Sequence, residues 1–126
     1  MFSEELITYI NMVTEEEQND LLFEMANLHS NTHGIPDVVI WVGQASKQHG
    51  LRVKVSNQKN KWNKYDNFII MMPSLDYDPK AVASWIDYAT IEKIKEWIKL
   101  NQKILYDYET GELDDTLLFI QQIAKM

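Results

Sequence analysis

The sequence contains no cysteine, which excludes disulfide bonds, thiolate metal sites and thiol nucleophiles. It also has no apolar run near the roughly 20 residues that a membrane helix needs. The first residues are acidic, unlike the basic start of a signal peptide. We therefore expect a soluble, cytoplasmic protein with no membrane contact. Because no repeat, low-complexity segment or interior linker is present, the 126 residues predict one domain with a modest core.

Positive charge is missing from the first third of the chain. Residues 1–43 hold eight acidic side chains and no Lys or Arg, whereas residues 44–65 hold six basic side chains and no acid. The segment 44–65 therefore carries +6, and the remaining residues, with six basic and 19 acidic side chains, carry −13. Such asymmetry often marks a partner surface. The alternative is that acidic helices and a basic hairpin lie side by side and neutralise one another.

The clearest pattern is an amphipathic helix from Thr90 to Tyr108. Apolar residues recur at spacings of three and four, and charged residues occupy the opposite face. Thr90 is the predicted N-cap, and Thr110-Gly111 is the predicted end. Asn101 interrupts the apolar stripe. Because a buried amide without partners costs roughly 1–3 kcal/mol per unmet group, we expect it to bond a loop or strand end.

Helices are also predicted on either side of the central region. Ser3–Val13 and Thr14–Leu28 repeat apolar residues at helical spacing, and Thr14 with Glu17 fits a capping box. The apolar stripe of the second helix is Leu21, Leu22, Met25 and Leu28. A last helix is predicted after Asp114 or Asp115, and its inward residues are expected to be Leu117, Leu118, Ile120 and Ile123.

Three segments, 37–42, 51–56 and 67–72, have the composition of strands. In the second, Leu51, Val53 and Val55 alternate with Arg52, Lys54 and Ser56, which predicts one buried and one open face. Short connections predict antiparallel pairing. Residues 29–36 are predicted to be a loop and 57–66 a long hairpin loop, and residues 79–86 form either a short helix or an edge strand.

The predicted fold class is α+β: a small antiparallel three-stranded sheet packed against a long amphipathic helix, with additional N- and C-terminal helices. The single domain, residues 1–126, then consists of an acidic helical N-terminal segment (1–29), a three-stranded meander (37–72) and C-terminal helices (90–124).

Several short motifs occur in order between residues 34 and 108: Gly34-Ile35-Pro36, a strand bearing Trp41, His49 before Arg52-Val53-Lys54-Val55, and Trp97-Ile98 followed by Asn101. In this order of motifs, residues 34–108 resemble a group of short, uncharacterised bacterial proteins. This chain has Gly50 where an acidic residue usually follows the His. The resemblance implies one α+β unit and no particular activity.

Two groups of residues are candidates for anion binding. Arg52 and Lys54 share one side of a strand, and His49 lies just before it, so the three could hold a phosphate or carboxylate, or simply form a solvated face. The loop that follows interleaves lysines with aromatics, as single-strand binding proteins do. Alternatively, Trp62 folds back onto the sheet as a core plug. These loop residues are Lys59, Lys61, Trp62, Lys64 and Tyr65.

Neither a metal ion nor a cofactor is predicted. His29 and His33 are four residues apart, but they lie in a predicted loop, and zinc needs three or four well-placed ligands. Asp76 and Asp78 could flank a divalent cation, yet Asp is a common turn residue. No catalytic carboxylate pair, catalytic triad or Gly-rich phosphate loop can be singled out.

Three functions remain open. The first is a small acidic, non-enzymatic binding or regulatory protein that meets a basic protein partner through Glu4, Glu5, Glu15, Glu16, Glu17 and Asp20. One form of it would be a phage or mobile-element inhibitor of a nucleic-acid-binding host or defence protein. The second is a nucleic-acid-binding module that uses the basic hairpin, and the third is a small-ligand sensor or enzyme around His49, Arg52 and Asn101. An exposed stripe of Ile7, Ile10 and Val13 would favour a dimer.

Overall fold

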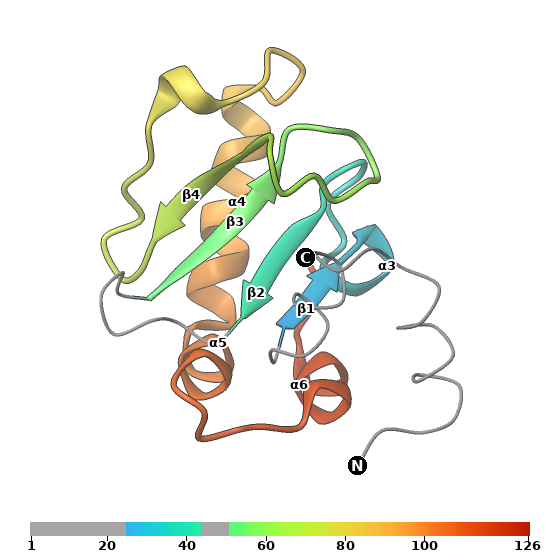
Figure 1. Ribbon diagram of the computed structural model, residues 1–126, viewed down its shortest axis with the longest axis vertical. Helices are drawn as coiled ribbons and strands as arrows, with labels where there is room; N and C mark the ends of the chain where they lie inside the picture. The colour runs from blue at the N-terminus through green and yellow to red at the C-terminus, as the bar shows by residue number, and fades with distance from the viewer. Residues whose placement is uncertain (1–24, 44–50) are drawn as a thin grey trace.

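The computed structural model describes residues 25–43 and 51–126. The predicted helix Ser3–Val13 and most of Thr14–Leu28 lie outside these residues. The described part is an α+β unit with a four-stranded antiparallel sheet in the order β1-β2-β3-β4 (Figure 1). Its strands are β1 (Met25–Leu28), β2 (Ile40–Gly43), β3 (Arg52–Ser56) and β4 (Asn67–Met71).

The described helices follow the strands, except for one short helix after β1. They are α3 (Ser30–His33), α4 (Tyr88–Leu100), α5 (Gln102–Glu109) and α6 (Thr116–Gln122), with a 3-10 turn η1 (Pro79–Ala81) before α4. The α+β class is therefore confirmed, whereas the prediction of three strands was one strand too few. Residues 79–86 form neither an edge strand nor an α-helix; Asp78 caps only the short η1 turn.

Strand β1 corrects the prediction that Met25 and Leu28 belong to a helix. Residues 25–28 pair antiparallel with β2, from Met25 opposite Gly43 to Leu28 opposite Ile40. Ala26 and Leu28 are buried and Asn27 between them is exposed, which is the period of a strand. Pairing with the apolar strand β2 outweighs the weak local preference of the sequence MANL, as tertiary context commonly does in sheets.

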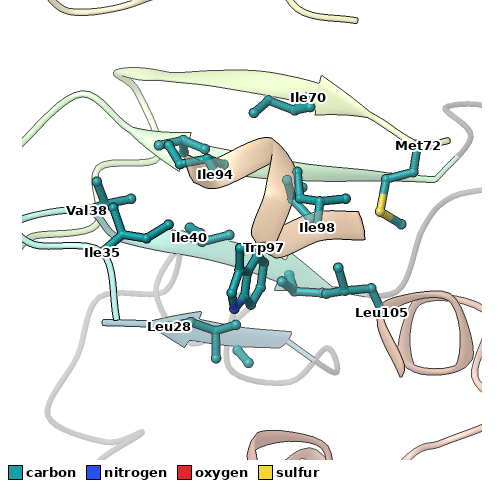
Figure 2. Close-up of a cluster of buried hydrophobic side chains, with 14 of the residues drawn as sticks. Leu28, Ile35, Val38, Ile40, Ile70, Met72, Ile94, Trp97, Ile98 and Leu105 are labelled. Carbon is teal, nitrogen blue, oxygen red and sulfur yellow. The ribbon is translucent and has the colours of Figure 1, made fainter. Parts of the chain in front are cut away.

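The hydrophobic core lies between one face of the sheet and helix α4, which runs behind the sheet in Figure 1. The buried side chains of α4 are Ile91, Ile94, Trp97 and Ile98. Figure 2 shows Trp97 and Ile98 among residues from the strands and from the loop before β2. Trp97 is completely buried, so α4 fixes which face of the sheet remains outside.

The predicted helix Thr90–Tyr108 is two helices. Asp87, not Thr90, is the N-cap of α4, because its side chain accepts a hydrogen bond from the Thr90 N–H at 2.8 Å. At Asn101 the backbone leaves helical geometry, with φ −106° and ψ 16°. The Asn101 side-chain amide donates to the carbonyls of Trp97 and Ala124, both at 3.0 Å, and accepts from the Ala124 N–H at 2.7 Å. The expected structural role of Asn101 is confirmed, and its partner is the C-terminal segment.

The last helix was predicted correctly in its cap and in part in its inward residues. Asp115 accepts a hydrogen bond from the Leu118 N–H at 3.1 Å and so caps α6. Ile120 and Ile123 pack against the core as predicted, whereas Leu117 and Leu118 are exposed, at 66% and 40%. Phe119, which was not predicted to face inward, is buried and stacks on Tyr108 with ring centroids 4.1 Å apart.

Replacing Asn101 with alanine should lower the free energy of unfolding by about 2–3 kcal/mol, because three hydrogen bonds are lost where the amide is buried. Urea denaturation measures this change. Gln102→Ala at the exposed neighbouring position is the control and should change stability by less than about 0.5 kcal/mol. Equal effects of the two substitutions would contradict the role assigned to the amide.

Candidate interaction surface on the outer face of the sheet

The face of the sheet opposite α4, called the outer face below, carries a row of side chains set by strand register. Asn27 lies opposite Trp41, Trp41 opposite Lys54, and Lys54 opposite Ile69. Asn27 and Ile69 are exposed, and Trp41 and Lys54 are half-buried. The row therefore crosses all four described strands and places an aromatic ring and a cation side by side near its centre.

Trp62 completes this cluster from the loop between β3 and β4. Its ring stacks on Trp41 with centroids 6.1 Å apart and an interplanar angle of 19°. The Lys54 ammonium lies 4.7 Å from the centre of a Trp41 ring, within the range of a cation–π contact. The alternative prediction that Trp62 folds back onto the sheet as a core plug is right about the sheet and wrong about the core, because Trp62 packs on Trp41 of the outer face.

The β3–β4 loop is braced by hydrogen bonds at several points. The Ser56 hydroxyl donates to the Lys61 carbonyl at 2.6 Å, and Asn60 bonds Asp37 through both its main-chain and side-chain N–H groups. Asn57 holds the base of the loop: its side chain donates to Asp66 and to the Ala81 carbonyl and accepts from the Ala83 N–H. These hydrogen bonds therefore give the loop a defined conformation at the surface.

The loop lysines lie beside aromatic rings or in solvent. Lys59 lies 5.4 Å from a Trp85 ring, and Lys64 lies 5.5 Å from the ring of Tyr65, which is 76% exposed. Lys61 is exposed. Of the predicted basic and aromatic residues, Lys54 and Trp62 therefore meet at Trp41, whereas Lys59 and Lys64 lie beside other rings.

Arg52 makes a main-chain contact that was not predicted from the sequence. Its main-chain N–H donates to a carboxylate oxygen of Glu109, the last residue of α5, at 3.2 Å. The described pairing of β2 with β3 ends at Trp41 and Lys54, so Glu109 takes the place of a strand partner for Arg52. The Nε and Nη1 atoms of Arg52 and the second carboxylate oxygen of Glu109 are buried without hydrogen-bond partners. His49 lies outside the described residues.

Glu109 was not singled out as a buried residue in the sequence analysis, although its helical spacing indicates burial. It follows Leu105 by four residues and therefore lies on the apolar face of its helix. Burial raises the pKa of Glu109 to about 8, which outweighs the opposing effects of the Arg52 N–H and the Arg52 charge. A carboxyl group in this state is largely protonated at neutral pH.

The other singled-out polar residues hold the fold. Both ring nitrogens of the buried His33 are engaged: Nε2 donates to the Val38 carbonyl at 2.8 Å, and Nδ1 accepts from the Ile35 N–H at 3.0 Å. Burial lowers the pKa of His33, consistent with a neutral ring. His33 ends the short helix α3 inside the predicted loop 29–36. Its nitrogens are therefore not available to a metal.

Asn101 likewise has no group left for a ligand, since its amide is used by Trp97 and Ala124. Within residues 25–43 and 51–126, no group of three or more His, Asp or Glu side chains is placed to hold a metal ion. The predicted acidic partner face lies outside the described residues; it comprises Glu4, Glu5, Glu15, Glu16, Glu17 and Asp20.

The Glu109 carboxyl should make stability depend on pH. Between pH 4.5 and about 8 the folded state keeps a proton that the unfolded state has released, so rising pH lowers the free energy of unfolding. The stabilising contribution is complete below pH 4.5 and is lost as pH rises through 8, at up to ~1.4 kcal/mol per pH unit.

Glu109→Gln keeps an acceptor for the Arg52 N–H and cannot ionise. Urea denaturation of both proteins across this pH range should show the variant gaining stability relative to the wild type as pH rises. A stability difference that does not change with pH would contradict the buried, protonated carboxyl. Glu112→Gln, at an exposed position nearby in the chain, serves as the control.

No family model, curated protein or solved structure matches this chain. The resemblance of residues 34–108 to short bacterial proteins therefore stays a prediction from the sequence. Among the described helices, none is long and apolar enough to cross a membrane.

Proposed function

We propose that the protein is a small acidic, non-enzymatic binding protein that regulates a partner through protein–protein contacts. The observation that carries this proposal is the Trp41–Trp62 stack near the centre of the outer face, with the Lys54 ammonium 4.7 Å from the centre of a Trp41 ring. Binding energy in protein interfaces concentrates in a few large side chains, Trp foremost, surrounded by a polar rim. A half-buried indole pair on a sheet face fits such an anchor.

The charge distribution supports a basic partner. Residues 1–43 hold eight acidic side chains and no basic ones, and the chain outside residues 44–65 carries −13. A field of this sign attracts a basic surface and speeds its association. One concrete form is a phage or mobile-element inhibitor that occupies the nucleic-acid groove of a host or defence protein.

The described geometry favours recognition over chemistry at the residues singled out earlier. A sensor or enzyme around His49, Arg52 and Asn101 would need the Asn101 amide to reach a ligand, but Ala124 and Trp97 occupy it. The Asn101 amide therefore holds the fold with the groups that a ligand would have to reach.

Charge reversal tests this function. The full chain is immobilised, and the proteins it captures from a lysate of the native host are quantified by mass spectrometry. Glu15→Lys with Glu16→Lys and Glu17→Lys should reduce capture of a basic partner at least tenfold, because three attractive charges become repulsive. Trp62→Ala should also reduce capture, through loss of the anchor.

The matched control is Glu96→Lys with Glu112→Lys and Asp114→Lys, which makes the same charge change at exposed positions of the described part. It should capture the partner as the wild type does. Equal loss with both triple variants, or a captured set with no basic protein, would remove the proposal.

A second candidate is single-stranded nucleic acid binding, which the loop lysines and aromatics favour. Trp62, the exposed Lys61 and the highly exposed Tyr65 all belong to the β3–β4 loop, where bases could stack beside cations. Two features weigh against it. Trp62 already covers one face of Trp41. The chain outside residues 44–65 carries −13, which repels phosphate outside the immediate basic patch, although salt screens this repulsion over a Debye length of about 8 Å.

Fluorescence polarisation with labelled single- and double-stranded oligonucleotides at low salt tests this candidate. Binding by the loop predicts at least tenfold weaker affinity for Trp62→Ala with Lys61→Glu. It predicts no change for Lys99→Glu, an exposed position on α4. No binding at micromolar protein would rule the candidate out.

A further inference from the structure

Strand β4 forms an edge of the described sheet, and its hydrogen-bonding pattern shows which main-chain groups face outward. The Met71 N–H donates to the Asp76 carbonyl at 3.0 Å, and the Met71 carbonyl accepts from the Leu75 N–H at 2.8 Å. These partners lie beyond the edge, away from β3. Because outward and inward groups alternate along an antiparallel strand, the main-chain groups of Asn67 and Ile69 also face outward.

Two further hydrogen bonds support this assignment. The Met72 N–H donates to the Leu51 carbonyl, and the Asn57 N–H donates to the Asp66 carbonyl. Positions 66 and 72 therefore bond toward the β3 side, which leaves the odd-numbered positions between them facing outward. Within the described part of the chain, the outward N–H and C=O groups of Asn67 and Ile69 have no hydrogen-bond partner. An edge with unpaired groups is a template for another extended chain.

A slot lies beside these unpaired groups. After β4 the chain returns alongside the strand (Figure 1), and residues of both segments line an open surface hollow of about 540 Å³. Its lining residues are Asn67, Phe68, Ile69, Met71, Asp76, Tyr77, Asp78 and Ala81. The Tyr77 ring tilts against Phe68, with centroids 6.3 Å apart.

The slot is mostly apolar, and its charged lining residues are both acidic. Asp76 and Asp78 line it from the returning segment, and Ile69, which is 39% exposed, lines it from the strand. Two cations lie near without lining it: Lys80 is exposed, and Lys95 lies over the Tyr77 ring at 5.0 Å and within 3.8 Å of Glu92. The slot thus combines a main-chain donor and acceptor, an apolar wall and two carboxylates.

We propose that this slot binds an extended, basic peptide segment of a partner protein by strand addition to β4. The peptide backbone pairs with the N–H and C=O of Ile69, an apolar side chain packs against Ile69 and Tyr77, and a Lys or Arg side chain meets Asp76 or Asp78. The proposal rests on the protein-binding function above and names a surface for the basic partner. A second copy of this chain fits less well, because an edge-to-edge dimer would bring the aspartates of both copies together.

The test is an NMR titration of the ¹⁵N-labelled full chain with synthetic capped hexapeptides. The first peptide alternates valine and lysine, the second alternates valine and glutamate, and the third is the first with alternate backbone nitrogens methylated. The valine–lysine peptide should shift the amides of Asn67, Ile69 and Asp76–Asp78 in a saturable way. The other two should bind at least about tenfold more weakly, because one loses the charge match and the other the backbone donors.

The variant Ile69→Pro removes the docking N–H. Since this N–H faces away from β3, the ladder to β3 is kept, and proline is tolerated on edge strands in such positions. Peptide affinity should fall about tenfold for Ile69→Pro and stay within about twofold for Ile69→Val, the matched control. The double variant Asp76→Asn with Asp78→Asn should also weaken peptide binding, and it replaces the proline variant as the test if that variant does not fold. Asparagine at position 78 keeps an oxygen that can accept the Lys80 N–H hydrogen bond and so cap η1.

Equal binding of all three peptides, shifts centred on Trp41 and Trp62, or β4 shifts that follow protein concentration without peptide would each overturn the proposal. The last result would assign the edge to a dimer. If the Ile69→Pro variant captures the basic partner as well as the wild type while peptide binding is absent, the slot proposal fails and the protein-binding function stands.

Discussion

The packing of α4 against one face of the sheet is the contact on which the rest of the molecule depends. Its four buried side chains, Trp97 among them, meet strand residues that are themselves fully buried. Burying a large apolar side chain contributes roughly 1.5–3 kcal/mol, so this interface dominates the stability of the unit. Because the helix occupies one face, polar and aromatic residues of the strands are directed to the other. The outer face is thus a consequence of where the core forms.

Three buried polar side chains act as substitutes for main-chain partners. His33 donates a hydrogen bond to the Val38 carbonyl and accepts one from the Ile35 N–H. Asn101 bonds both main-chain groups of Ala124, and Glu109 accepts a hydrogen bond from the Arg52 N–H. Each lies where a strand or helix stops and leaves main-chain groups that burial would make costly. Buried His and Glu residues often suggest chemistry, but here each has a structural explanation at the atomic level.

The sequence predicted the elements whose patterns are local and missed those that depend on distant contacts. Strand β3 was found because Val53 and Val55 alternate with polar residues. Strand β1 was missed because the spacing of three residues between Met25 and Leu28 fits a helix. Only the pairing with β2 shows that this segment is a strand. The break at Asn101 was missed because the apolar stripe resumes after it in the same helical spacing, at Ile104 and Leu105. The stack of Trp41 on Trp62 and the contact of Arg52 with Glu109 join segments far apart in the chain.

Asn57 joins the two surfaces that would bind partners. It stands at the base of the loop that carries Trp62, and its amide also holds Ala81 and Ala83 in the segment that returns beside β4. The indole N–H of Trp85 bonds the Asn57 carbonyl as well. If a molecule that binds the tryptophan pair displaces this loop, these hydrogen bonds transmit the change to the wall of the slot. Thermodynamic linkage then requires that a peptide in the slot alter affinity at the tryptophan pair by the same factor.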